Sequence, residues 1–109
     1  MMNEFKNVKN YKTEPLDEHG VYMAAYFCDE LGRDWYETRK GWVGAVAVDA
    51  NGLVCSVARS SRQVQLFTMV EGQTLYEVEP EIIPADPLGK YKFLNGDFVI
   101  FSSDSASGA

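Results

Sequence analysis

The segment Leu31-Gly32-Arg33-Asp34-Trp35-Tyr36-Glu37 places a turn glycine, two opposite charges and two adjacent large aromatic side chains within seven residues. Residues 21–28 before it form an apolar run rich in aromatic side chains, which favours a β-strand over a short buried helix. A glycine-containing turn follows this run, so we expect residues 33–37 to pair back with it as a hairpin. Because side chains alternate along a strand, Trp35 and Tyr36 are expected on opposite faces, one in the core and one at the surface or under a partner.

Two Asn-Gly pairs mark the turns of two further hairpins. Asn51-Gly52 closes a four-residue turn, and Asn95-Gly96 is a two-residue turn of type I′, because both residue types tolerate positive φ. A less regular segment at 64–70 is also interpreted as extended. The strands expected along the chain are 21–28, 33–37, 42–48, 53–58, 64–70, 73–78, 91–94 and 97–101.

Helical periodicity is missing from the sequence: nowhere do apolar residues recur at helical spacing over three turns with caps at both ends. The sequence therefore predicts a mainly β fold with little helix, a small antiparallel sheet or meander of hairpins in an open-barrel or sandwich-like arrangement. Three prolines interrupt regular pairing after residue 79. The expected organisation is an N-terminal arm at 1–20, a main antiparallel β domain at 21–79, a Pro-rich loop at 80–90, a C-terminal hairpin at 91–101 and a flexible tail at 102–109.

Length and composition indicate one acidic domain. The 109 residues are 46% hydrophobic, which is enough material for a single core. The formal net charge of −6 disfavours nucleic-acid binding, because affinity for phosphate backbones depends on Lys and Arg. No apolar run is long enough to span a bilayer, and the N-terminus lacks the apolar region of a signal peptide. We therefore expect a cytoplasmic protein with no nucleic-acid or membrane partner, and homo-oligomerisation stays open.

The chain contains few residues that suggest catalysis or metal binding. Catalysis by Cys28 with His19, the only histidine, would need an exposed and activated thiol, whereas Cys28 and Cys55 both lie in apolar runs typical of buried free thiols. A disulfide between the two cysteines stays open, because geometry decides it. Two Cys and one His are too few for a zinc site without carboxylates. We expect no catalytic residue, no metal and no cofactor.

The alternating acidic residues Glu77, Glu79 and Glu81 would project from one face of an extended strand. Such a row suits a glycosidase pair or a cation site, but a solvated sheet edge that discourages edge-to-edge pairing is the favoured interpretation. The segment Asp49-Ala50-Asn51-Gly52 begins like a calcium loop but lacks the glutamate that should close it, so it is interpreted as a turn.

Aromatic side chains make up 13% of the chain, and a domain of this size cannot be expected to bury them all. Tyr and Trp left on one surface suit a protein interface, because each provides a large contact area and a polar group at low entropic cost. A carbohydrate-binding platform would use the same side chains. The alternative, in which nearly all of them are core, stays open.

Residues 30–37, Glu-Leu-Gly-Arg-Asp-Trp-Tyr-Glu, resemble the D-E-x-G-x-D-W-Y-E motif of tail fibre assembly proteins, the tail fibre chaperones of bacteriophages and prophages. The order of the next segments is also similar: residues 46–54 resemble the family's strand, D-x-x-G turn and strand, 73–78 its closing strand, and 91–99 its aromatic hairpin. The acidic residue and proline usual before the closing strand are missing. The helical C-terminal region usual in the family is also missing, so we expect a short form.

The resemblance implies a non-enzymatic assembly chaperone that binds the C-terminal end of a trimeric tail fibre and helps it trimerise. Such a protein acts in the cytoplasm of the bacterial host cell and in some systems stays on the virion. The alternative is a small carbohydrate-binding or structural phage or prophage domain that uses exposed aromatic side chains. The residues expected to bind the partner or support that surface are Arg33, Asp34, Trp35, Tyr36 and Trp42.

Overall fold

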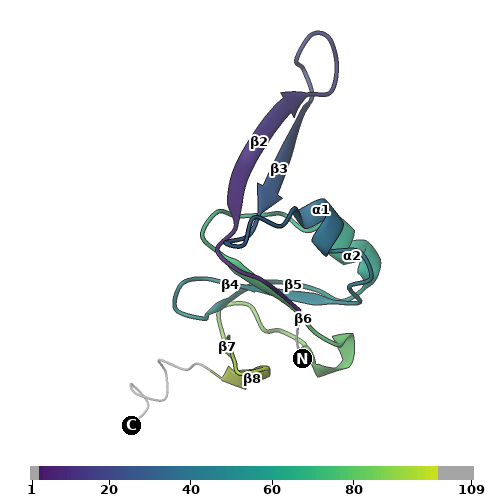
Figure 1. The fold of residues 1–109 in the computed structure, drawn as a ribbon. Coiled ribbons are helices and arrows are strands. Elements are labelled where there is room, and N and C mark those ends of the chain that lie inside the picture. The colour runs from purple at the N-terminus through teal and green to yellow at the C-terminus, as the bar shows by residue number, and fades with distance from the viewer. Residues whose placement is uncertain (1–2, 101–109) are drawn as a thin grey trace.

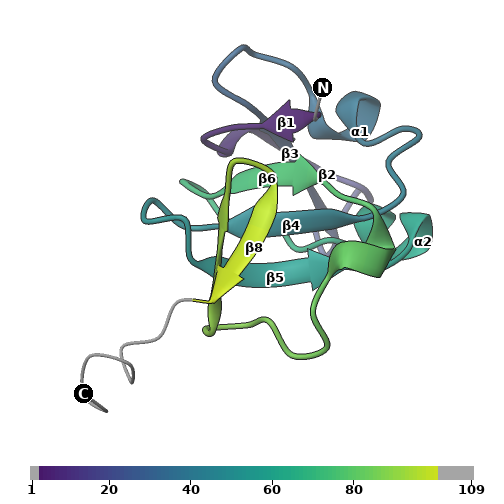
Figure 2. The same cartoon turned by 90° about the horizontal axis from the view of Figure 1, so that it is seen from below.

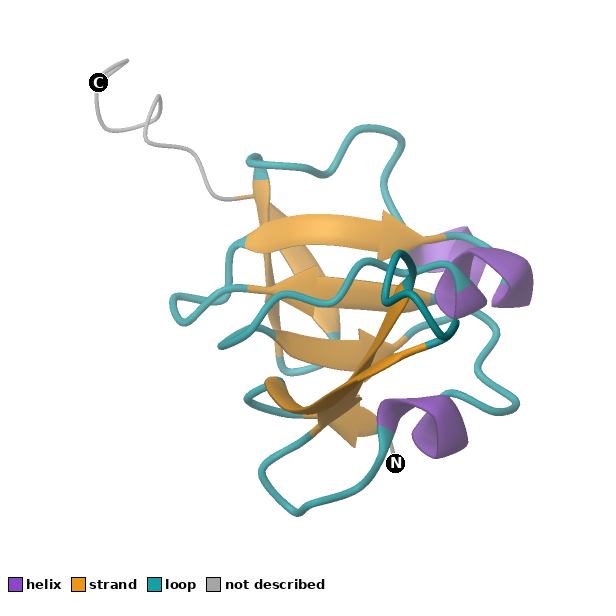
Figure 3. Ribbon diagram, turned by 90° about the horizontal axis from the view of Figure 1, so that it is seen from above, coloured by secondary structure: helices purple, strands orange, loops and turns teal. Residues whose placement is uncertain are grey.

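A computed structural model describes residues 3–100, and these form the mainly β, antiparallel fold that the sequence predicts. Strands make up most of the regular secondary structure, and the helices are short (Figure 3). The elements in chain order are β1 (Glu4–Phe5), β2 (Lys9–Pro15), β3 (Met23–Cys28), α1 (Trp35–Thr38), β4 (Ala45–Val48), β5 (Val54–Ala58), α2 (Ser61–Gln65), β6 (Thr74–Glu77), the 3-10 helix η1 (Pro80–Ile82), β7 (Tyr91–Leu94) and β8 (Asp97–Ile100).

The centre of the molecule is a four-stranded antiparallel sheet in the order β1-β6-β4-β5. All four residues of β4 are buried, which explains its unbroken Ala-Val-Ala-Val sequence. The turn between β4 and β5 is the one that the sequence predicts. There Asp49 Oδ1 accepts hydrogen bonds from the backbone N–H groups of Asn51 (2.8 Å) and Leu53 (3.0 Å), and Gly52 adopts a φ of +83°.

The sheet is covered on both faces (Figures 1 and 2). On one face, α1 and α2 lie over a core that contains Phe5, Trp35, Trp42 and Val64. On the other face, the β7–β8 hairpin lies over a second core that includes Phe93. This hairpin is the one predicted from Asn95-Gly96, and both turn residues have positive φ, 52° and 87°. Its predicted last residue, at 101, and the tail at 102–109 lie outside the described residues.

Strands β2 and β3 form a two-stranded ribbon that projects from the face carrying the helices (Figure 1). The ribbon lengthens the molecule to 59 Å, against 28 and 25 Å along its other two axes. The prediction that residues 21–28 contain a strand is confirmed. Its strand partner is β2, however, and with residues 33–37 it forms only the single antiparallel bridge Cys28–Asp34 before α1 begins, so the expected hairpin is wrong.

Residues 35–38 form the helix α1 because Asp34 caps its N-terminus. The Asp34 carboxylate accepts a hydrogen bond from the backbone N–H of Glu37 (3.1 Å), which satisfies a donor that the first helical turn leaves free. Trp35 is buried and Tyr36 partly exposed, which is the contrast expected for a strand. It arises here because successive helical residues point about 100° apart.

The prediction of a strand at 64–70 is also wrong, because the segment begins in α2 and contains no strand. Ser60 caps α2 by accepting a hydrogen bond from the backbone N–H of Gln63 (3.2 Å), and the helix runs through Gln65. The predicted strands at 42–48, 53–58 and 73–78 are confirmed as β4, β5 and β6, each shorter than expected.

The N-terminal residues contribute more to the fold than the arm expected for 1–20. Strand β1 pairs with β6, and the side chains of Phe5 and Val8 are fully buried in the main core. Residues 9–20 do leave the body, as one half of the ribbon and part of its tip.

Replacing Phe5 by Ala should lower the free energy of unfolding by about 3–5 kcal/mol, because it leaves a cavity against the Trp35 ring, 4.9 Å away. Chemical denaturation monitored by tryptophan fluorescence measures this loss. Tyr22→Ala, at an exposed position on the ribbon, is the matched control and should change the free energy by less than about 0.5 kcal/mol. Equal effects of the two variants would contradict the placement of β1 in the core.

Candidate docking surface

The turn after β3 is organised by a buried carboxylate. Asp29 is only 2% exposed, and its Oδ1 accepts hydrogen bonds from the backbone N–H groups of Leu31 (3.0 Å) and Arg33 (2.9 Å). Its Oδ2 accepts one from Arg33 Nε (2.7 Å) and forms an ion pair with the same guanidinium. Gly32 supplies the positive φ that this tight turn needs. The buried charge is therefore both paired and hydrogen-bonded.

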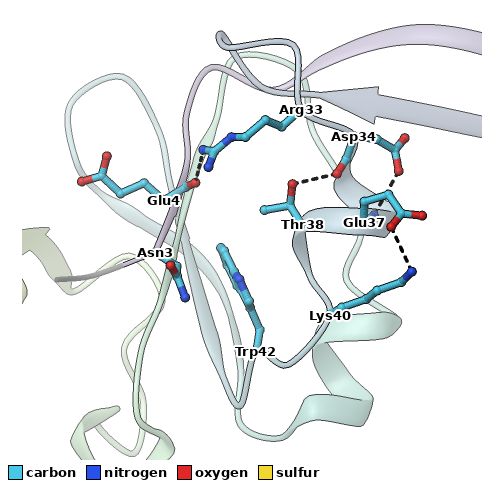
Figure 4. A pocket seen from close by; sticks show the side chains of 8 residues that line it. All are labelled: Asn3, Glu4, Arg33, Asp34, Glu37, Thr38, Lys40 and Trp42. Atoms are coloured by element: carbon cyan, nitrogen blue, oxygen red, sulfur yellow. Dashed lines mark hydrogen bonds and ion pairs between the residues drawn. The ribbon is translucent and has the colours of Figure 1, made fainter.

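Arg33 links this turn to the four-stranded sheet. Its Nη2 donates a hydrogen bond to the backbone carbonyl of Glu4 in β1 (2.7 Å; Figure 4). The Glu30 backbone N–H also donates to the carbonyl of Lys6 (2.8 Å). The turn is thus fastened to the N-terminal segment at two points, which fixes the base of the ribbon relative to the sheet.

Asp34 joins the ribbon to α1. One carboxylate oxygen caps the helix, while the other, Oδ1, accepts a hydrogen bond from the Tyr11 hydroxyl of β2 (2.6 Å). The Thr38 hydroxyl donates to the Asp34 carbonyl (2.8 Å), which closes the first helical turn (Figure 4). The hydrogen bond and the negative charge of Asp34 raise the pKa of Tyr11 to about 12, because both favour the protonated phenol.

An open groove of about 590 Å³ lies between the N-terminal segment and α1. The residues that line it are Asn3, Glu4, Arg33, Asp34, Glu37, Thr38, Lys40 and Trp42 (Figure 4). Its charged groups of both signs are already engaged within the chain: Lys40 Nζ pairs with Glu37 (2.9 Å), and Arg33 pairs with Asp29. The groove has the composition of a polar interface rim, and its Trp42 ring is almost entirely buried.

The five predicted site residues come together at this junction but differ in what they contact. Arg33, Asp34 and Trp42 line the groove. Trp35 packs edge-on between Phe5 and Trp42, with ring centroids 4.9 and 5.2 Å away, and has no access to a partner. Tyr36 points to the ribbon instead, where its hydroxyl donates to the Ala25 carbonyl (3.1 Å).

The base of the ribbon carries a cluster of tyrosines that the sequence pattern does not predict. The rings of Tyr11, Tyr26 and Tyr36 follow one another at centroid distances of 6.4 and 5.4 Å, and the Arg39 guanidinium lies 4.6 Å from the Tyr36 ring. Tyr11 and Tyr36 are exposed. Partly exposed Tyr and Arg side chains of this kind are enriched at protein interfaces. The aromatic content of the arm and the first strand was the available signal, but the pairing of β2 with β3 was not foreseen.

The far end of the ribbon carries a second exposed apolar group. The four large side chains there are 53–68% exposed; they are Leu16, Val21, Tyr22 and Met23. Two backbone hydrogen bonds shape this tip, from Leu16 N–H to the Tyr22 carbonyl (2.8 Å) and from Gly20 N–H to the Asp17 carbonyl (3.3 Å). The Asp17 carboxylate accepts a third from Val21 N–H (2.9 Å). The conformation of the tip loop is therefore defined by its own hydrogen bonds.

The edges of the four-stranded sheet are protected, which leaves the ribbon and the β7–β8 hairpin as the two-stranded elements of the described fold. Edge strand β1 has two residues, too few to template another strand. Alongside edge strand β5 runs the Pro-rich loop (Figure 2), where the Arg59 guanidinium binds the Pro84 carbonyl (2.6 Å) and Gly89 N–H donates to the Val54 carbonyl (3.2 Å).

The candidate catalytic groups are not assembled. His19 lies in the tip loop beside Glu18, whereas Cys28 ends β3 at the base of the ribbon. Cys28 and Cys55 are free thiols, each half-buried where fully buried ones were expected, and burial raises the pKa of Cys55, which makes it a weaker nucleophile. Within residues 3–100, no three His, Cys, Asp or Glu side chains are arranged to hold a metal ion.

The expected acidic row is divided between different structures. Glu77 belongs to the interior strand β6 and accepts hydrogen bonds from Asn3 Nδ2 (2.6 Å) and Val43 N–H (3.0 Å). Glu79 and Glu81 lie at the start of η1. The interpretation of these residues as a solvated sheet edge is wrong, because the strand ends at Glu77.

Comparison with models of known protein families gives no match, and a search of curated proteins finds no significant similarity. In the part of the chain that the structure describes, no helix is long and apolar enough to cross a membrane.

Replacing Asp29 by Ala should lower the free energy of unfolding by about 3 kcal/mol, because two backbone donors and a guanidinium lose their acceptor. Asp34→Ala should cost about 1 kcal/mol, the usual loss for an N-cap. Glu37→Ala is the control at the exposed end of the same segment and should cost less than about 0.5 kcal/mol. Urea denaturation of the three variants measures the order, and a neutral Asp29→Ala would contradict the role assigned to the buried carboxylate.

The Tyr11 phenol should ionise later than an ordinary tyrosine. The difference between ultraviolet titrations of the native chain and Tyr11→Phe should have its midpoint near pH 12, and Asp34→Asn should move it down towards 10. Since folding raises this pKa, the stability from the Tyr11–Asp34 bond is fully present below about pH 10 and is lost as the pH rises towards 12. A midpoint at 10 in the native chain would show that the bond is not formed in solution.

Proposed function

We propose that this chain is a non-enzymatic assembly chaperone that binds the C-terminal end of a trimeric tail fibre through the ribbon and the tyrosine cluster at its base. The observation that carries the proposal is the ribbon itself, a two-stranded element with exposed apolar and aromatic side chains that projects from a body whose four-stranded sheet has protected edges. The resemblance of residues 30–37 to tail fibre assembly proteins supplies the identity of the partner.

The ribbon has the physical properties that such a role requires. A two-stranded hairpin is marginal alone in water, and this one gains support from Asp34, Tyr36 and the turn at its base. Exposed apolar side chains on a monomer mark interaction surfaces. A chaperone for a β-rich fibre has to cover apolar surface and unpaired edges until three chains meet, and an exposed ribbon can supply both contacts.

The placement of the aromatic residues decides which of them can test the proposal. Trp35 and Trp42 support the core, so their replacement would unfold the chain and reveal nothing about the partner. Tyr11 and Tyr36 are exposed next to the groove and can contact another protein directly.

Co-expression of the full chain with the C-terminal segment of the tail fibre encoded beside it should give a soluble stoichiometric complex, with the fibre trimeric only in its presence. Size-exclusion chromatography with light scattering measures this. The double variant Tyr11→Ala, Tyr36→Ala should lose the complex, because two large contacts are removed. Tyr11→Phe, Tyr36→Phe loses the same hydrogen bonds to Asp34 and Ala25 but keeps both rings, so it should retain the complex.

Leu88→Ser is the matched control for this experiment, since it alters an exposed apolar residue on the Pro-rich loop, and it should bind like the native chain. A fibre that trimerises unaided, without forming a complex, would reject the chaperone role. Binding of the isolated chain to glycans would then favour the carbohydrate-binding alternative, with Tyr11, Tyr22 and Tyr36 as the exposed rings.

A further inference from the structure

We infer that the tip of the ribbon inserts into an apolar cleft at the C-terminal end of the fibre, and that this cleft is bordered by Lys or Arg side chains. This inference rests on the proposed function and specifies the chemistry of its partner. The tip comprises the apolar residues Leu16, Val21, Tyr22 and Met23 together with the acidic residues Asp17 and Glu18.

The apolar part of the tip is not buried by the described part of the chain. Its four large side chains are 53–68% exposed, and the ribbon holds them away from both hydrophobic cores (Figure 1). The molecule is 59 Å long but at most 28 Å across, so the tip can enter a recess that excludes the body. Because the loop is shaped by three internal hydrogen bonds, less conformational entropy is lost when it binds.

The charge of the tip selects the partner. No Lys or Arg lies between Lys12 and Arg33, whereas the tip carries Glu18, which is exposed, and Asp17, which is half-buried. Glu18 Oε1 lies 3.4 Å from Nε2 of the neighbouring His19. An acidic apolar tip is complementary to an apolar cleft with a basic border, and such complementarity speeds association and selects the partner.

The same charges disfavour the other occupants of an exposed apolar patch. Two copies of the tip placed together would bring like charges into contact, which opposes a tip-to-tip dimer. A membrane surface rich in anionic lipids would repel Asp17 and Glu18, since binding there depends on Lys and Arg.

The test uses the full chain and the purified C-terminal fibre segment in a calorimetric titration. The double variant Val21→Ser, Tyr22→Ser should weaken binding at least tenfold, because it removes two exposed apolar side chains from the tip. Glu18→Lys should weaken it about tenfold at low salt and by less at high salt, because salt screens exposed charges. Glu18 suits charge reversal, since its side chain is 87% exposed.

Leu66→Ser, which alters a 73% exposed apolar residue at the end of α2, is the matched control and should bind like the native chain. Native binding by both tip variants overturns the insertion while leaving the chaperone role intact. No binding by the native chain overturns both. Dimers of the native chain that the tip variants abolish, or sedimentation of the native chain with phosphatidylglycerol vesicles, would show that the tip serves another occupant.

Discussion

The hydrogen bonds accepted by two carboxylates, those of Asp29 and Asp34, are the constraint on which the rest of the structure depends. Asp29 fixes the turn after β3 and holds the guanidinium of Arg33 against β1. Asp34 starts α1 and binds Tyr11 in β2. The strands of the ribbon, the edge of the sheet and the first helix therefore meet at these two side chains. The direction in which the ribbon projects follows from this junction, because its outer half contacts no core.

The protection of the sheet edges gives the ribbon its importance. β1 is too short to recruit a strand, and the Pro-rich loop held by Arg59 runs along β5. Proline lacks a backbone donor, so this loop shields the edge without offering a template for further pairing. The uncharged run at residues 21–28, by contrast, belongs to a strand with one partner. A chain that covers the edges of its four-stranded sheet and leaves this apolar strand only half-buried has a surface suited to a partner.

Local signals in the sequence predicted the parts of the fold that local chemistry decides. The Asn-Gly turns and the apolar segments around them gave the β4–β5 and β7–β8 hairpins, because a tight turn fixes its own register. The pairing of β1 with β6 places Phe5 opposite Leu75, which is far away in the sequence. A turn motif indicates only pairing between neighbouring segments, so the sequence does not predict this contact. The sequence predicts a strand at residues 33–37 because the four residues of α1 are too few to show helical periodicity of apolar side chains. Asp34, three residues before Glu37, is nevertheless a helix-capping signal.

The five residues predicted from the motif meet at one junction, where their contacts are mainly within the chain, and this bears on what the sequence motif indicates. Within residues 29–37, Asp29 shapes the turn, Gly32 provides its positive φ, Asp34 caps α1 and Trp35 fills the core. Each of these residues is required by the junction whatever the chain binds. Similarity at these positions therefore indicates that two chains share this junction and a ribbon held at its base. It is less direct evidence that they bind the same partner. Selectivity for a partner has to come from exposed side chains, and in the proposed interface those are the tyrosine cluster and the acidic tip of the ribbon. Chains that share the motif but differ at residues 16–23 should accordingly share the fold of the junction and differ in what they bind.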